Sequence, residues 1–119
     1  MKVIVAGCRH IGFVTPVYEA IEASGFEITE HVSGGAGGAD ACGECWAREN
    51  EIDTRIFRAK WGLHGRSAGP RRNRRMAEYA DALIAVWDGK SRGTQNMIKE
   101  AKVRGLQVYV HRIDEEMNR

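Results

Sequence analysis

The feature that most constrains the fold is a repeated junction, in which a short apolar run stops at a glycine-rich or polar loop and a helical pattern follows. Residues 3–6 are apolar and stop at Gly7, and residues 82–87 are apolar and stop at the loop 88–93. Such runs are typical of strands buried on both faces of a parallel sheet. Strands alternating with helices at this spacing predict βαβ units, which close right-handedly into a parallel sheet with helices on both faces.

The rest of the chain continues this alternation. Helices are expected over 15–24, 39–50, 70–80 and 94–104, and further strands over 26–33, 53–58 and 108–110. Charges alternate with apolar residues in 53–58, which places that strand near an edge of the sheet, and residues 59–69 have no clear periodicity. The predicted fold class is α/β: one Rossmann-like domain over residues 1–113 with about five parallel strands, followed by a polar C-terminal tail over 114–119.

Composition excludes several other classes of protein. The chain has 119 residues and a net charge of +2, with 43% hydrophobic and 29% charged residues, as expected for one ordinary globular domain. No apolar stretch approaches the length of a membrane span, which needs about 20 residues, and no signal-peptide pattern opens the sequence. We therefore expect a cytoplasmic protein without a membrane partner.

The cysteines and histidines predict neither a disulfide framework nor a metal site. Three cysteines in a chain without an export signal favour reduced thiols. Cys42 and Cys45 form a C-x-x-C on a predicted helix, but no second pair accompanies it, so core-facing thiols are favoured over redox or metal chemistry. The four histidines have no metal-ligand spacing. No metal and no cofactor is inferred.

Four loops are expected to meet at the carboxyl edge of the sheet, because all four precede or open a helix and three directly follow a predicted strand. They are residues 7–10, 34–40, 69–73 and 91–94. Helix N-termini carry unpaired N–H groups, and glycines let an anion approach the backbone closely. Any one loop alone is explained by a tight turn, but four at one edge favour a phosphate site. Neither a dinucleotide fingerprint nor a Walker motif is present.

These motifs together resemble one family. Gly7-Cys8-Arg9, the run 33–40 (SGGAGGAD), Trp61 with residues 64–66, the run 68–73 (AGPRRN) and Trp87-Asp88-Gly89 with residues 91–94 are similar to the YspA-type, cpYpsA-related branch of the SLOG superfamily. The resemblance covers about residues 2–111 and implies a Rossmann-like fold that binds a nucleotide or nucleotide-derived small ligand. The ligand-binding residues it implies are Gly7, Cys8, Arg9, Gly34, Gly35, Ala36, Gly37, Gly38, Asp40, Trp61, Arg72, Asn73, Asp88, Ser91, Gly93 and Thr94.

The superfamily also includes the DprA DNA-binding proteins and the LONELY GUY phosphoribohydrolases, and the latter sharpen the question of catalysis. Arg72 and the pair Gly93-Thr94 match the phosphoribohydrolase pattern. Met97 stands where that family has its catalytic Glu, and residues 87–89 (WDG) replace its Pro-Gly-Gly turn. The resemblance thus implies retained phosphate binding and puts N-glycosidic cleavage in question.

Two acids remain as candidates for chemistry on the ligand edge. Asp88 ends a strand and has no capping role that the sequence reveals, so it is the favoured catalytic residue, together with Arg72. Asp40 starts a helix, where a capping role is equally expected. Cys8 either replaces a hydroxyl ligand or is a nucleophile activated by a helix N-terminus or by Arg9.

The leading hypothesis is a domain that holds the phosphate of a nucleotide derivative, as a sensor, a sequestering protein or a hydrolase. The anion is then held by Gly35, Gly37, Gly38, Arg72, Gly93 and Thr94. The alternatives are a nucleotide phosphoribohydrolase that uses Asp88 or Asp40, and a nucleic-acid-binding module that uses the arginines between positions 66 and 75. Sheet edges and exposed apolar faces in so short a chain favour a homodimer. The sequence leaves open the identity of the ligand, whether it is cleaved and the biological context.

Overall fold

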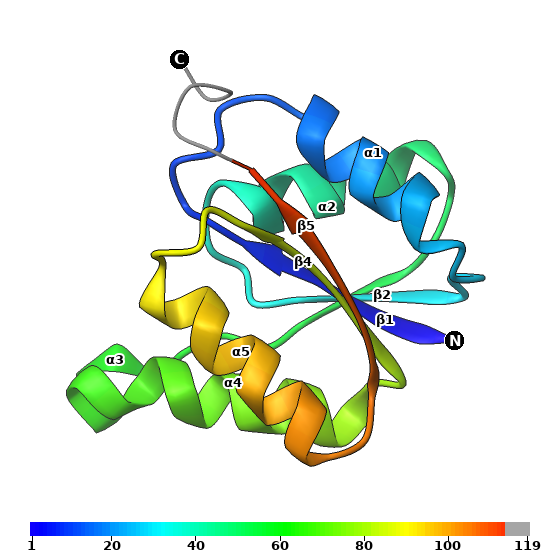
Figure 1. Ribbon diagram of the computed structural model, residues 1–119. Helices are drawn as coiled ribbons and strands as arrows, with labels where there is room; N and C mark the ends of the chain where they lie inside the picture. Colours follow the sequence, from blue (N-terminus) through cyan, green and yellow to red (C-terminus); the bar gives the residue numbers. More distant parts are fainter. Residues whose placement is uncertain (114–119) are drawn as a thin grey trace.

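A five-stranded parallel sheet forms the centre of the computed structural model, which describes residues 1–113 (Figure 1). The strand order is β3-β2-β1-β4-β5, and all four pairings are parallel. The strands are β1 (Lys2–Gly7), β2 (Glu30–Ser33), β3 (Thr54–Ile56), β4 (Ala82–Trp87) and β5 (Gln107–Arg112). This confirms the predicted α/β, Rossmann-like fold class. The polar tail expected over 114–119 lies outside the described residues.

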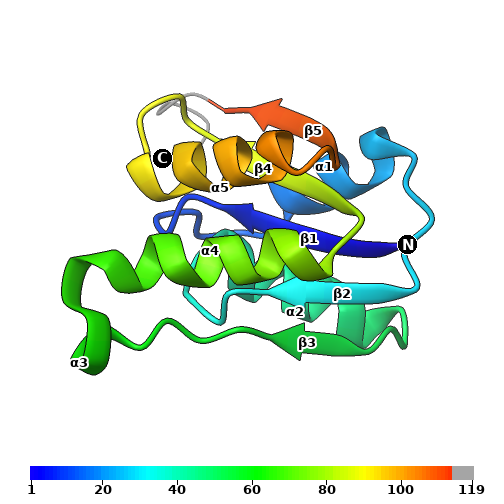
Figure 2. The ribbon, with the colours of Figure 1, turned by 90° about the horizontal axis from the view of Figure 1, so that it is seen from below.

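Helices cover both faces of the sheet (Figures 1 and 2). One face carries α1 (Thr15–Ser24) and α2 (Ala39–Glu49), and the other carries α4 (Ala68–Tyr79) and α5 (Arg92–Val103). Between β3 and α4 the chain forms the short helix α3 (Trp61–His64) and the 3-10 turn η1 (Gly65–Ser67).

Alternation along β1 explains why both faces are apolar. Val3 and Val5 pack with Val17 and Ile21 of α1, whereas Ile4 packs in the second cluster, on the face that α4 and α5 cover. β4 alternates in the same way, and every residue of its run 82–86 is fully buried. Successive side chains of a strand point to opposite faces, so an unbroken apolar run is what a sheet covered on both sides requires.

The topology produces a crevice between β1 and β4. From β1 the chain winds outward through β2 to β3, and it then crosses back to β4 and β5 on the other side of β1. The loops after β1 and β4 therefore leave neighbouring strands towards opposite faces, and ligands of such sheets bind at this switch point, outside the carboxyl ends of the strands.

Several boundaries differ from the sequence-based expectation, including those of β3 and β5. Residues 26–29 precede β2 instead of belonging to it, and α4 starts at Ala68, which puts Pro70 in its first turn, where a missing N–H costs no helical hydrogen bond. The segment 59–69, without periodicity in the sequence, contains α3, η1 and the start of α4. Within residues 1–113, none of the helices has the length and apolar character that crossing a bilayer demands.

Candidate functional site

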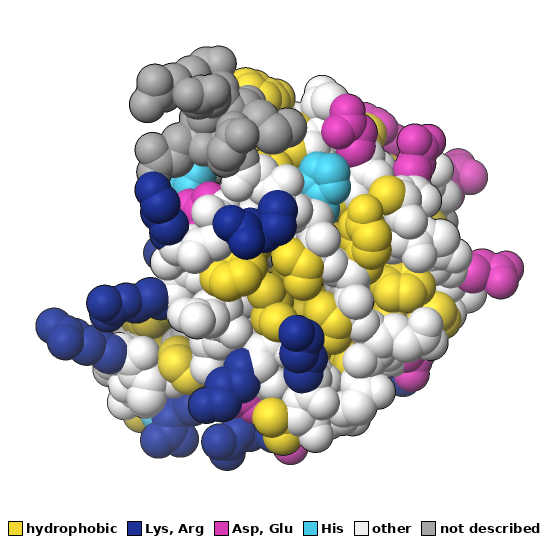
Figure 3. Space-filling model, viewed as in Figure 1, with side chains coloured by type: hydrophobic (Ala, Val, Ile, Leu, Met, Phe, Trp, Pro, Cys, Tyr) yellow, Lys and Arg dark blue, Asp and Glu magenta, His cyan; other side chains and the backbone are white. Residues whose placement is uncertain are grey.

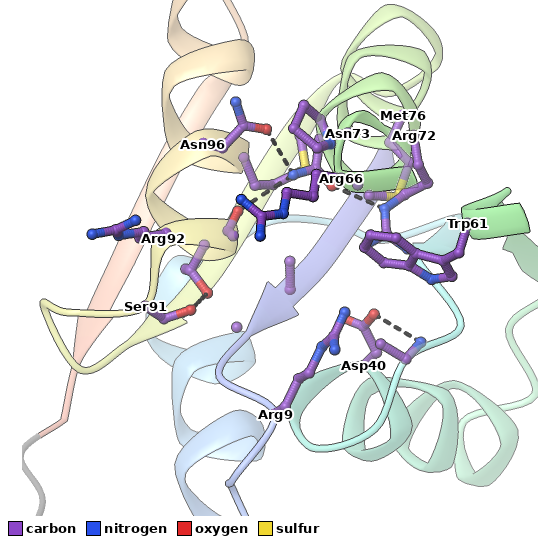
Figure 4. A pocket seen from close by; sticks show the side chains of 18 of the residues that line it. Arg9, Asp40, Trp61, Arg66, Arg72, Asn73, Met76, Ser91, Arg92 and Asn96 are labelled. Atoms are coloured by element: carbon purple, nitrogen blue, oxygen red, sulfur yellow. Dashed lines mark hydrogen bonds between the residues drawn. The ribbon is translucent and has the colours of Figure 1, made fainter. Parts of the chain in front are cut away.

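A hollow of about 480 Å³ lies at the switch point between β1 and β4 (Figure 4). Its size is within the usual range for small-molecule sites. The walls come from the end of β1, the loops that precede α2 and α5, the α3–η1 segment and the first turns of α4 and α5. The lining residues are Ala6, Gly7, Arg9, His10, Ala36, Asp40, Trp61, Arg66, Gly69, Pro70, Arg72, Asn73, Met76, Ser91, Arg92, Gly93, Thr94, Asn96 and Met97.

Many of the residues expected to bind ligand line this hollow. They are Gly7, Arg9, Ala36, Asp40, Trp61, Arg72, Asn73, Ser91, Gly93 and Thr94. Six others do not line it: Cys8, Gly34, Gly35, Gly37, Gly38 and Asp88. All four loops singled out in the sequence contribute to the wall, so the loops do meet at one edge of the sheet.

The glycines of the loop 34–38 do not line the hollow, but they allow the close contacts that hold its wall in place. Gly38 has φ +63°, and a Cβ there would collide with the carbonyl oxygen of Cys8. This close approach lets the N–H of Ala39 donate to that carbonyl, at 3.1 Å. A Cβ on Gly34 would lie 2.5 Å from Nη1 of Arg72 and 2.9 Å from Oδ2 of Asp40. Gly34 therefore leaves the space in which these two charged side chains approach the backbone.

Arg72 is almost completely buried and fixed by two hydrogen bonds. Its Nη1 donates to the carbonyl of Gly34 at 2.7 Å, and its Nε donates to Oδ1 of Asn73 at 3.0 Å. Guanidinium has five N–H donors, and the structure shows no further hydrogen bond for it within residues 1–113. Desolvation lowers the pKa of Arg72, while Asp40 favours its charged form. Arg72 thus presents a fixed positive charge with spare donors to the hollow.

Asn73 joins α4 to α5. Its Nδ2 donates to the carbonyl of Gly93 at 3.3 Å and to Oδ1 of Asn96 at 2.9 Å, while its Oδ1 accepts from Arg72. One side chain therefore fixes the spacing between the buried guanidinium and the N-terminus of α5 (Figure 4).

Asp40 is the one carboxylate that lines the hollow, as far as the described residues go. Its Oδ2 accepts the N–H of Ala36 at 3.1 Å, so it braces the loop before α2, whose N-cap position is Gly38. Burial raises the pKa of Asp40 to about 6, against the opposing effects of the Ala36 N–H and the charge of Arg72. An acid with such a pKa exchanges its proton near neutral pH.

The first turn of α5 offers donors to an anion. Gly93 and Thr94 line the hollow, and amides in the first turn of a helix have no intrahelical partner. The hydroxyls of Ser91 and Thr94 lie 3.2 Å apart at the same end. The N-terminal partial positive charge of the helix favours a phosphate there.

The opposite rim is aromatic and basic. The Trp61 indole is half exposed, lies against Gly69 and has the Arg9 guanidinium 5.8 Å from its ring centroid. Arg66 and Arg92 also line the hollow, Arg92 from the N-terminus of α5, and Figure 4 shows these side chains around one hollow. Four arginines thus face a single carboxylate across the lining, which makes the hollow electropositive.

The expected ligand-binding set was incomplete, although the expected loops 7–10, 69–73 and 91–94 contain some of the missing residues. His10, Arg66, Gly69, Pro70, Met76, Arg92, Asn96 and Met97 line the hollow but were absent from the expected ligand set. Arg92 and Asn96 lie one helical turn apart on α5, a spacing that signals one shared face. Arg66 had no such signal, because η1 is irregular.

Asp88 has a structural role that the sequence did not reveal. Its Oδ1 accepts the N–H groups of Lys90 and Ser91, both at 2.8 Å, and so shapes the loop that leads into α5. Burial works to raise the pKa of Asp88, but these two N–H groups, together with Cys8 and His10, hold the pKa below its ordinary value. Asp88 therefore remains charged and stands beside the hollow, not in its wall.

Cys8 differs from an activated nucleophile. Its side chain is buried, and desolvation raises the pKa of the thiol above its ordinary value. Cys42 is also buried, in the core that α1 and α2 share, as the sequence predicts, whereas Cys45 is only partly covered and donates to Glu49.

Comparison with known proteins gives one family and one viral relative. The family described as "YspA, cpYpsA-related SLOG family" matches residues 1–64. The chain is similar to the "Gene 61 protein" of Mycobacterium phage D29, with 37% identity over 83 residues, which span 65% of this chain and 66% of that protein. No solved structure matches the chain significantly.

Proposed function

The chain belongs to the YspA, cpYpsA-related SLOG family, and from this membership we propose that it binds a nucleotide-derived anion in the hollow between β1 and β4. The family indicates a nucleotide-related role and no particular ligand. The observation that carries the proposal is the union of a buried guanidinium, Arg72, with the N-terminus of α5 in one hollow.

One side of the hollow suits the phosphate of a nucleotide, and the other side suits its base. Phosphate oxygens would accept from the amides of Gly93 and Thr94 and from the spare donors of Arg72, which are charge-assisted contacts. A base would stack on the half-exposed indole of Trp61, beside Arg9. The roles of Gly35, Gly37 and Gly38 in this proposal are indirect, because these glycines set the loop behind the wall.

Direct binding measurements test this proposal. Calorimetric titration with cyclic AMP, AMP and ADP-ribose should give binding for at least one of the three. Replacing the exposed Arg66 by Gln should weaken that binding about tenfold, because one charge-assisted hydrogen bond to a ligand is worth roughly 1.5–3 kcal/mol.

Arg48→Gln is the matched control, since Arg48 is an exposed arginine on α2 outside the lining. Equal losses of affinity in both variants, or no binding of any of the three probes, would contradict the proposal.

Chromatography of each mixture after incubation shows whether the protein cleaves the probe. If cleavage occurs, Asp40 is the acid that we assign to it, and an active Asp40→Asn together with an inactive Asp88→Asn would return that role to Asp88.

A second candidate function uses the outer side of α4. A separate hollow of about 300 Å³ is lined by Lys60, His64, Ala68, Arg71, Arg74 and Arg75. It has no acidic residue in its wall, which suits the phosphates of a nucleic acid. Figure 3 shows basic side chains gathered where α3 and α4 lie. The arginine run of the sequence thus divides between two hollows, with Arg66 and Arg72 in the first.

Salt dependence separates the two candidates. A single-stranded DNA should bind with an affinity that falls steeply with salt if the outer hollow is used. Arg74→Gln should then weaken DNA binding and leave cyclic AMP binding unchanged, whereas Arg66→Gln should do the reverse. Fluorescence anisotropy measures both, and salt-independent or absent DNA binding would eliminate this second function.

A further inference from the structure

The loops after β1 and β4 bring together a thiol, an imidazole and a carboxylate from distant parts of the chain. Sγ of Cys8, a ring nitrogen of His10 and a carboxylate oxygen of Asp88 all lie within 4.8 Å of one another. Nε2 of His10 is 3.8 Å from Oδ2 of Asp88. These are the three kinds of atom that bind zinc in proteins.

The carboxylate is oriented as a metal ligand usually is. Oδ1 of Asp88 accepts the N–H groups of Lys90 and Ser91, whereas Oδ2 is the oxygen nearer the His10 ring. Hydrogen bonds of this kind hold a ligating carboxylate in one orientation. The side chain of Asp88 is only 10% exposed, so it is not one of the solvated acids that are common on protein surfaces.

Cys8 is held in place by its backbone. Its N–H donates to the carbonyl of Val86 at 3.2 Å, and its carbonyl accepts the N–H of Ala39 at 3.1 Å. The thiol is thereby fixed between the end of β4 and the start of α2. The His10 side chain is 50% exposed, which gives an ion access from solvent and gives the ring freedom to turn.

We propose that Cys8, His10 and Asp88 form a three-ligand site for a thiophilic divalent cation such as Zn²⁺. Zinc bonds of about 2.0–2.3 Å place tetrahedral ligand atoms roughly 3.5 Å apart. No pair of ligand atoms therefore needs to close by more than about 1.3 Å, and the exposed His10 ring is free to move. The thiolate selects zinc and similar ions over magnesium, which prefers oxygen ligands.

The site has only three protein ligands, so a fourth position remains for water or an anion. His10 also lines the main hollow, and this puts the cation at the edge of that hollow. The proposal goes beyond nucleotide binding and does not depend on it, because the three ligands hold the ion without any organic molecule.

Cobalt substitution tests the site without a nucleotide. Reduced, metal-free protein titrated with Co²⁺ should develop a thiolate-to-cobalt charge-transfer absorption that Zn²⁺ abolishes and that excess Mg²⁺ does not. Competition with a chromophoric chelator gives the zinc affinity. His10→Gln and Asp88→Asn should each lower that affinity at least tenfold, and Cys8→Ser should remove the charge-transfer band.

The variants are chosen to keep the fold. Asn at position 88 keeps an oxygen for the amides of Lys90 and Ser91, and His10 is an exposed side chain. The double variant Cys42→Ser, Cys45→Ser is the matched control, because it removes the other two thiols and should retain the band. Circular dichroism verifies that each variant is folded. If Cys8→Ser does not fold, the zinc affinity of His10→Gln tests the proposed site.

Two results would overturn the site. One is the absence of a charge-transfer band in the wild-type protein. The other is unchanged zinc affinity in His10→Gln. Neither result bears on nucleotide binding, which is measured in the absence of metal.

Discussion

At the residue scale, Asp40 is the acidic side chain in the wall of the proposed anion site. It lies in the wall of an otherwise basic hollow, and burial brings its pKa to about 6. The ionised carboxylate of Asp40 repels a bound anion. When the carboxyl group takes up a proton, this repulsion disappears. Arg72, Glu44 and Arg9 are the charged groups that act on it.

We therefore expect the affinity for cyclic AMP to rise several-fold as the pH falls from about 7.5 to 5.5, since Asp40 becomes neutral across its pKa. The phosphodiester of this probe keeps its single charge over that range. Calorimetry at several pH values measures the effect, and Asp40→Asn should flatten the profile. A pH dependence that persists unchanged in Asp40→Asn would refute the assignment.

His31 makes an independent contribution to acid sensitivity. It is fully buried, with Nδ1 3.0 Å from Oγ1 of Thr54, and burial lowers its pKa to about 4. The unfolded chain takes up this proton near pH 6.5 and the folded chain does not, so the free energy of unfolding falls as the pH drops from 6.5 towards 4. Urea denaturation should show a loss of up to about 3 kcal/mol from this residue.

The effect of His31 is read as a difference between proteins. Asp40 acts with the opposite sign between about pH 6 and 4, because its raised pKa makes the folded state bind the proton more tightly. Subtracting the pH profile of His31→Gln from that of the wild type cancels Asp40. A difference that does not change over this range would refute the assignment.

At the scale of elements, the β2–α2 loop depends on glycine at one position and tolerates alanine at its neighbour. Gly38 has a positive φ and no room for a Cβ, whereas Gly37 has neither restriction. Gly38→Ala should lower the free energy of unfolding by at least about 2 kcal/mol, and Gly37→Ala should change it by less than about 0.5 kcal/mol. Urea denaturation of both variants tests this, and equal effects would refute it.

The strands and four long helices could be predicted from the sequence because each has a periodic or unbroken apolar pattern. Residues 82–87 form β4 as expected, and the charged pattern of 53–58 correctly indicated an edge strand. The α3–η1 segment could not be predicted, since four residues of helix contain too few positions for a period to emerge.

The candidate site was predicted through its loops, and less well through its individual side chains. Arg72 and Thr94 both line the hollow, but Gly35 packs behind it against Ile56 and Arg58. The grouping of Cys8, His10 and Asp88 could not be seen in the sequence, because Cys8 and His10 are two residues apart and Asp88 joins them only through the pairing of β1 with β4. Residues so far apart in the sequence form no motif that could be recognised from their spacing.

At the scale of the whole molecule, charge is distributed unevenly although the net charge is only +2. Figure 3 shows acidic side chains near α1 and basic ones near α3 and α4. Arginines surround the opening of the main hollow, so the electrostatic potential there is positive.

This asymmetry predicts electrostatic steering of the ligand. The association rate constant of cyclic AMP should fall at least about threefold between ~20 mM and ~500 mM salt, because screening shortens the reach of the arginine charges. Stopped-flow tryptophan fluorescence can follow the reaction. Adenosine, which carries no charge, is the control and should associate at a rate that salt leaves unchanged. Equal salt effects on both would contradict steering.

The crossing from β3 back to β4 carries Trp61 and Arg66, although neither belongs to the sheet or its four long helices. Insertions, deletions and substitutions in this connecting segment can therefore leave every strand paired as before. Such changes can alter part of the hollow's wall, while Arg72 on α4 and the first turn of α5 keep their places in the fold.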